Sequence, residues 1–355
     1  MKKKQWILAL VVVAALAAIL YKAFERGKIH FSFGDFRSQL ALADWHGIAI
    51  GVACIYLGYV IRAIRWALLM KHNKKVPVFS LLGTQVIGFT AVALIGRVAD
   101  LVRPYLVAKR TGLELSTQIA VYIVERLFDA GAMALIFSSV ILLAPAGSLP
   151  HPEIVKKAGL WGLALTMCGA LFLVAVRLAG GLVASFFERS FGLISKNLGI
   201  AAGHKIRTFQ SGLDTMRSFS EFGAVTALSL VMWLMISLAY LEVARAFAAS
   251  PQLSSMTLGK CMLLLAASGG ASVLQLPILG WFTQIAAVAA TLAGLGAAPE
   301  AATACAATLL LVTFLSIAPV GLIWARFEHV SIRKIASESE HAGEKLGGDQ
   351  PKSSA

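Results

Sequence analysis

Residues 117–143 read TQIAVYIVERLFDAGAMALIFSSVILL, which is long and apolar enough for a helix that crosses a bilayer. Three charged residues, Glu125, Arg126 and Asp129, interrupt this stretch. At a rise of about 1.5 Å per residue, Glu125 and Asp129 would lie about 12 and 18 Å below Thr117, well inside the hydrocarbon. Ionised side chains at such depth are costly, so they predict a functional site.

The spacing of these charges places them together on the helix surface. Glu125 and Asp129 are four residues apart and share a face, and Arg126 reaches Asp129 at a spacing of three. We favour the interpretation that this face lines a polar cavity. The alternative is an ion network that only pins the helix to its neighbours.

The rest of the chain is equally apolar. Of its 355 residues, 58% are hydrophobic and 14% are charged, whereas about a quarter of the residues of soluble domains are charged. Further apolar runs of spanning length occupy residues 6–24, 47–70, 158–177, 222–247 and 301–325. The sequence therefore predicts an all-α polytopic membrane protein with about six full spans.

Two other stretches predict re-entrant helical hairpins. Residues 78–112 join a short apolar piece to a charged run, and residues 257–296 hold two apolar pieces broken by Pro277 and Gly280. If both return to the side from which they enter, the first enters from the cytoplasm and the second from outside. Two broken segments of opposite entry are typical of an inverted repeat around a transport site, which we take as a hypothesis.

The formal net charge of +14 comes from basic residues that cluster at the ends of the apolar runs. Loops rich in Lys and Arg stay in the cytoplasm. This rule predicts cytoplasmic N and C termini in a bacterial inner (plasma) membrane, with anionic lipid headgroups as partners. We expect no nucleic acid partner, because aromatic residues do not alternate with the basic ones.

The predicted domain organisation is simple. Residues 1–330 form a single transmembrane domain, which begins with a retained signal anchor and includes an amphipathic cytoplasmic stretch at about 180–219. Residues 331–355 are polar and are predicted to be a disordered cytoplasmic tail. The four cysteines lack metal or redox spacing, so we expect no metal and no other cofactor.

The first hairpin supplies candidate phosphate ligands. Arg97, Asp100 and Arg103 lie in its charged run, and Arg103 precedes Pro104, where backbone donors are left free. A guanidinium beside such donors binds phosphate bidentately. The alternative is a surface helix whose basic residues simply meet the headgroups of the inner leaflet.

Two further groups of candidates flank this hairpin in the sequence. For Arg62 and Arg65, near the end of run 47–70, we favour snorkelling to the interface, although Arg62 is deep enough to face the same cavity. In the second hairpin, helix-breaking and polar residues predict a cavity lining, because broken backbone is tolerated only there or against protein. These residues are Gln275, Pro277, Gly280 and Gln284.

Three motifs together resemble a known family. They are Arg62-x-x-Arg65-Trp66, Gly96-Arg97-Val98-Ala99-Asp100-Leu101-Val102-Arg103-Pro104 and Glu125-Arg126-Leu127-Phe128-Asp129. In this order they resemble the flippase-like transmembrane family that includes the membrane domain of lysylphosphatidylglycerol synthases. The resemblance covers about residues 47–325 and is strongest over 58–130.

The sequence departs from the family pattern at two places. Ala99-Asp100 stands where the family usually has Gly-Glu, and the second-half turn keeps only Pro277, Gly280 and Gln284 of its usual motif. The resemblance implies translocation of a modified or anionic lipid between leaflets. It does not imply lipid synthesis, because we find no soluble acyltransferase-like domain, and we expect no enzyme activity.

Three functional hypotheses follow. In a lipid transporter for a phospholipid or polyprenyl phosphate, Arg62, Arg103 and Arg126 would hold the phosphate, while Glu125 and Asp129 would balance charge or carry protons. In a membrane-embedded glycosyltransferase, Asp35 or Asp44 would be the base. In an accessory protein of cell-envelope synthesis, which would bind proteins of that pathway, the charges would only join helices.

Overall fold

The computed structural model describes residues 31–145, 147, 149, 152–213, 218–272 and 279–348. Its regular elements are α2 Phe33–Ala41, α3 Trp45–Met70, α4 Val78–Ile95, η1 Arg97–Leu101, α5 Val102–Thr111, α6 Leu115–Leu143, α7 Pro152–Gly192, α8 Lys196–Leu213, α9 Phe219–Arg245, α10 Pro251–Ser254, α11 Leu258–Ala271, α12 Leu279–Gly294, α13 Pro299–Leu310, η3 Leu311–Leu315, α14 Ile317–Phe327 and α15 Ile332–Gly348. All are helical, which confirms the predicted all-α class for the described residues.

Six of the described segments are long and apolar enough to cross a membrane. They are α3, α4, α6, the first part of α7 (Pro152–Phe172), α9 and the continuous run Pro299–Phe327. Five of them coincide with predicted spans, and the sixth, α4, belongs to the first predicted hairpin. The predicted span 6–24 lies outside the described residues. The protein is a multi-pass membrane protein.

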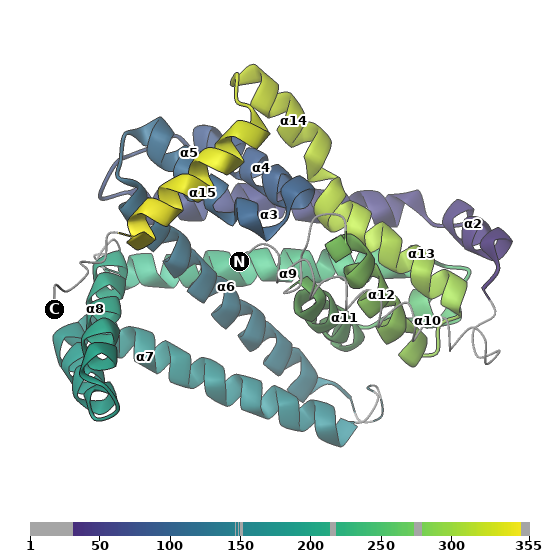
Figure 1. The fold of residues 1–355 in the computed structure, drawn as a ribbon. Helices are drawn as coiled ribbons and strands as arrows, with labels where there is room; N and C mark the ends of the chain where they lie inside the picture. The colour runs from purple at the N-terminus through teal and green to yellow at the C-terminus, as the bar shows by residue number, and fades with distance from the viewer. Residues whose placement is uncertain are drawn as a thin grey trace.

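The helices are arranged around a long central pair. Figure 1 shows α3 and α9 packed side by side along the middle of the molecule, with α4, α5 and α15 over one end and α10 to α13 over the other. Two N-caps explain where these long helices begin. Asp44 accepts a hydrogen bond from the His46 backbone at 3.0 Å, and Ser218 accepts one from Glu221 at 3.1 Å.

Each predicted hairpin segment contains helices that pack against each other, although α4 is itself long and apolar enough to cross a membrane. In the first, α4 ends at Gly96, whose φ of 88° turns the chain into η1 and α5, and both elements pack back against α4. Only glycine adopts this backbone conformation without strain. In the second, α11 packs against α12, and the turn between them, residues 273–278, lies outside the described residues.

The two hairpins meet. The Trp281 indole N–H, in the first turns of α12, donates a hydrogen bond to the Ala93 carbonyl near the end of α4 at 3.2 Å. This contact joins the turning ends of two segments that are 188 residues apart in the sequence. It meets the condition that an inverted repeat imposes, that the hairpins face each other, but the repeat itself stays a hypothesis.

Helices α7 and α8 form an arm at the edge of the molecule (Figure 1). The backbone of α7 is kinked at Ala179, where φ is −139° and ψ is 38°. Beyond the kink, large apolar side chains such as Phe186, Leu193 and Ile194 are exposed. The amphipathic stretch predicted at 180–219 therefore consists of the end of α7 and helix α8.

The C-terminal segment differs from its prediction. Residues 331–355 were expected to be disordered, yet Ile332–Gly348 form α15, which packs over η1 and α5. Ile335 and Ala336 of α15 are buried, and the Tyr105 hydroxyl donates to Glu338 of the same helix at 2.9 Å. Although this segment is polar overall, it contains a narrow apolar stripe at helical spacing. A helix with such a stripe is stabilised by packing against a single neighbouring surface.

Candidate functional site

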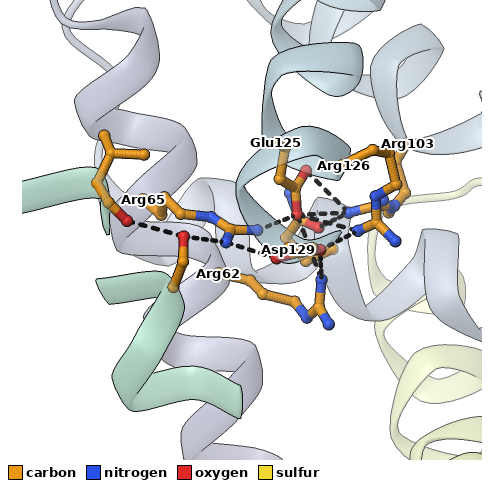
Figure 2. Close-up of polar contacts among 9 residues, drawn as sticks. Arg62, Arg65, Arg103, Glu125, Arg126 and Asp129 are labelled. Atoms are coloured by element: carbon orange, nitrogen blue, oxygen red, sulfur yellow. Dashed lines mark hydrogen bonds and ion pairs between the residues drawn. The ribbon is translucent and has the colours of Figure 1, made fainter. Parts of the chain in front are cut away.

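Six of the predicted site residues, which come from three helices, form one charge cluster (Figure 2). Helix α3 contributes Arg62 and Arg65, and α5 contributes Arg103. Helix α6 contributes the two carboxylates and the fourth arginine, namely Glu125, Asp129 and Arg126. The charges of run 117–143 therefore meet partners from two other helices.

Glu125 is the centre of this charge cluster. Its carboxylate lies 2.8 Å from the Arg65 guanidinium and 3.3 Å from that of Arg62. The guanidinium groups of Arg103 and Arg126 lie 3.3 Å away. Only 1% of the Glu125 side chain is exposed, so four cations surround one anion out of reach of bulk water.

Asp129 is the second carboxylate, one helical turn further along α6. It pairs with Arg65 at 2.6 Å, Arg62 at 3.2 Å and Arg126 at 2.9 Å. The contact with Arg126 has the spacing of three that the sequence predicted. The interhelical contacts to α3 could not be predicted from that spacing.

Uncharged residues from two more helices complete the network. Ser229 of α9 accepts a hydrogen bond from Arg65 at 2.7 Å, and Gln85 of α4 accepts one from Arg103 at 2.9 Å. Neither residue was predicted from the sequence. In the sequence, each is only an uncharged polar residue within an apolar run, and many Ser and Gln residues occur in such runs.

Aromatic rings enclose Arg103. Its guanidinium carbon lies 4.4 Å from the ring centroid of Phe89, 5.0 Å from that of Tyr122 and 5.5 Å from that of Trp66. Such cation–π contacts stabilise a cation that has lost its water. Arg103 is therefore held in place by the fold, with only 1% of its side chain exposed.

The charge cluster carries more positive than negative charge. It contains four guanidinium groups, which stay protonated in proteins, against two carboxylates. Asp100 is half-buried in η1, where its charge also acts on Arg126. Arg97 begins η1, but its side chain is not among those described. An anion would offset the excess positive charge of the six-residue cluster.

Two of the arginines remain accessible. The side chain of Arg126 is 39% exposed and that of Arg62 is 10% exposed, whereas Arg65 is fully buried. The favoured interpretation that Arg62 and Arg65 snorkel to the interface is therefore wrong. Both turn inward, because the carboxylates of α6 offer ion pairs that are stronger in a buried site than near water.

A cavity of about 200 Å³ lies between α3, α9 and the helices of the second hairpin. Arg62 lines it from α3, and Ser268 and Gln284 line it from the second hairpin. Aromatic residues, among them Tyr59 and Trp233, form much of its wall. Of the charge cluster, only Arg62 lines this largely apolar space. Glu125, Arg126 and Asp129 instead form an ion network with neighbouring helices, which was the alternative interpretation of their spacing.

The second hairpin is polar where it meets this cavity. Gln284 is buried and donates from Nε2 to Ser268 Oγ at 2.6 Å, and the Tyr240 hydroxyl donates to the same oxygen at 2.9 Å. Gly280 is buried in the first turn of α12. Gln275 and Pro277 lie outside the described residues. The structure thus brings Gln284 to the cavity that Arg62 also lines.

Gly88 makes room for the side chain of Arg103. A Cβ atom at Gly88 would overlap the Arg103 side chain. We expect Gly88→Ala to destabilise the protein by about 1–3 kcal/mol, the usual cost of overpacking, measured as the free energy of unfolding in mixed micelles. Gly131→Ala is the control, because nothing lies within 4 Å of its Cβ position. Equal stability of both variants would contradict this packing role.

Among the described residues, no group of three or more His, Cys, Asp or Glu residues could hold a metal ion. The cysteines Cys54, Cys168, Cys261 and Cys305 are all unpaired thiols.

Comparison with known proteins agrees with this arrangement. The model of the lysylphosphatidylglycerol synthase TM region matches residues 6–321, nearly the whole chain. Comparison with curated proteins finds no match. The family match includes all three motifs that carry the charge cluster and both hairpins. The chain therefore belongs to the family of the lysylphosphatidylglycerol synthase transmembrane region.

Proposed function

We propose that this protein moves a phosphate-bearing lipid, of the phospholipid or polyprenyl-phosphate type, between the leaflets of the membrane. Family membership supports a function on membrane lipids. The observation that carries the finer proposal is the charge cluster, in which four arginines face two carboxylates beside a cavity between two hairpins. An excess of guanidinium charge beside a cavity suits the binding of an anionic phosphate monoester or diester.

Arg62 and Arg126 are the phosphate ligands in this proposal. They have the two most exposed side chains among the four arginines of the charge cluster, and Arg62 lines the cavity itself. Arg65 and Arg103 are buried against carboxylates and rings, so they orient Glu125 rather than contact lipid. A lipid phosphate would partly replace the carboxylates as partner of the two accessible arginines.

The environment of Asp44 argues against one of the two candidate bases of a glycosyltransferase. The Asp44 carboxylate accepts the hydrogen bond that caps α3, and this bond lowers its pKa below the ordinary value. A carboxylate with a lowered pKa is a weaker general base. Its role as an N-cap accounts for an acidic residue at this position without catalysis.

The proposal includes a location and partners. Basic residues at one set of helix ends support a bacterial inner membrane with both termini in the cytoplasm. Anionic headgroups are the lipid partners, and proteins of cell-envelope synthesis would supply or consume the lipid. Protease protection of tags at the two ends, in spheroplasts, would test the orientation.

Lipid translocation in proteoliposomes tests the proposed activity. The probe is a fluorescent short-chain phosphatidylglycerol, whose inward movement protects it from dithionite, and a labelled polyprenyl phosphate forms a second arm. Arg126→Ala is expected to lower the rate roughly 10- to 100-fold, the value of a charge-assisted hydrogen bond. Arg62→Ala should have the same effect.

The control is Arg37→Ala, which removes an exposed arginine of α2 remote from the charge cluster. This variant should translocate both probes at the wild-type rate. Unchanged translocation by a folded Arg126→Ala protein would refute the assignment of Arg126. A wild-type rate no higher than that of protein-free vesicles, for both probes, would favour the accessory protein.

A further inference from the structure

Two buried polar atoms on side chains that line this cavity lack hydrogen-bond partners. One belongs to Gln284 of α12 and the other to Trp233 of α9. Gln284 is 5% exposed, and while its Nε2 donates to Ser268, its Oε1 has no hydrogen-bond partner. The buried Trp233 Nε1 also has none. Buried polar groups in native proteins are nearly always hydrogen-bonded, so each exception requires an explanation.

Both atoms belong to side chains that line the same cavity as Arg62. Its volume of about 200 Å³ is many times the roughly 10–15 Å³ that one water needs. The cavity therefore accommodates a chemical group larger than a water molecule. That group would meet a free acceptor at Gln284 and a free donor at Trp233.

The chemistry of these atoms restricts the group. A hydroxyl both donates and accepts hydrogen bonds, so a polyol can satisfy both side chains. A primary ammonium only donates, and a quaternary ammonium does neither. No Asp or Glu is among the described residues that line this cavity, so a cationic headgroup would find no carboxylate on the cavity wall to pair with.

We propose that Gln284 and Trp233 bind a neutral hydroxyl-bearing group, such as glycerol or a sugar alcohol, that is attached to the phosphate held at Arg62. This inference rests on the proposed function and specifies its substrate class. Ser268 is a positioning residue, because it holds the amide nitrogen of Gln284 and so directs Oε1 away from itself. The Tyr240 hydroxyl fixes Ser268 in turn.

Competitive lipid binding, measured by native mass spectrometry of the detergent-solubilised protein, tests the inference. The probes are phosphatidylglycerol, phosphatidylinositol, phosphatidic acid and phosphatidylcholine with identical acyl chains. The wild-type protein is expected to prefer the two hydroxyl-bearing lipids over phosphatidic acid by roughly tenfold, the value of one or two neutral hydrogen bonds.

The double variant Gln284→Leu, Trp233→Phe should bind all three anionic lipids equally, with the affinity for phosphatidic acid unchanged. The control Met133→Leu alters an apolar residue of the same cavity and should retain the preference. Arg62→Ala should weaken binding of all three anionic lipids and leave their order unchanged.

Three results would overturn the inference. Equal wild-type affinity for phosphatidylglycerol and phosphatidic acid would mean that water satisfies the two atoms. A preference for phosphatidylcholine would mean that the aromatic rings of this cavity bind a quaternary ammonium instead. Failure to bind any anionic lipid would overturn the proposed function as well, whereas the first two results would leave it standing.

Discussion

Replacing Glu125 with Gln is expected to lower the free energy of unfolding by about 3–5 kcal/mol, the cost of removing one partner from a buried ion pair. Glu125 lies within 3.3 Å of four guanidinium groups. Without its charge, four arginines would face Asp129 alone. Titration with a denaturing detergent, followed by tryptophan fluorescence, measures the effect.

A second substitution tests whether the loss of stability comes from the unbalanced charge and not from the changed shape of the side chain. Adding Arg103→Met to Glu125→Gln restores the original excess of two positive charges, so the double variant should recover at least about 1 kcal/mol, a coupling typical of contacting residues. Glu153→Gln, at an exposed position at the start of α7, is the control and should stay within about 0.5 kcal/mol of the wild type. Equal stability of Glu125→Gln and Glu153→Gln would show that the charges are not coupled.

Joining the two hairpins is expected to stop lipid translocation completely. Trp281 of α12 and Ala93 of α4 are in contact across the hairpins, and alternating access requires elements around a central site to move apart. Ala93→Cys and Trp281→Cys would be combined in a protein whose four native cysteines are replaced by alanine. A short bis-methanethiosulfonate reagent should reduce the translocation rate to that of empty vesicles, and reduction should restore it.

The control pair lies away from the hairpins. A Cβ at Gly159 of α7 would lie 2.9 Å from Ile141 of α6, so Ile141→Cys with Gly159→Cys can be bridged in the same way. This bridge should leave translocation unchanged, as should each single cysteine treated with the reagent. Quantitative cross-linking of 93 to 281 with a normal rate would exclude hairpin separation as a step of transport.

The sequence predicted the membrane helices well because spanning length and apolarity are local properties of a segment. The run 117–143 became α6, with its three charges on one side. Both predicted hairpin segments contain packed helices, and the first segment turns at Gly96. The polar composition of residues 331–355 predicted disorder, yet Ile335 and Ala336 of α15 are buried in a helix that packs against η1 and α5. Composition alone does not show that such a partner surface exists.

The site was predicted as a set of residues but not as an arrangement. Depth in a span does not say which way a side chain turns, so Arg62 and Arg65 were expected near the interface rather than in ion pairs with α6. Gln85 and Ser229 were not predicted as site residues, because uncharged polar residues are common in apolar runs. Each acquired its role only through an arginine on another helix.

By itself, therefore, the sequence determined an all-α membrane protein, two broken helix pairs and the residue types of a charged site, because hydropathy, helix period and helix-breaking residues act over a few turns. Only the tertiary structure decided that Glu125 has four cationic partners, three of them 22 to 63 positions away in the chain. It also decided that Gln284 shares a cavity with Arg62. Such contacts depend on how helices pack, which no local pattern specifies.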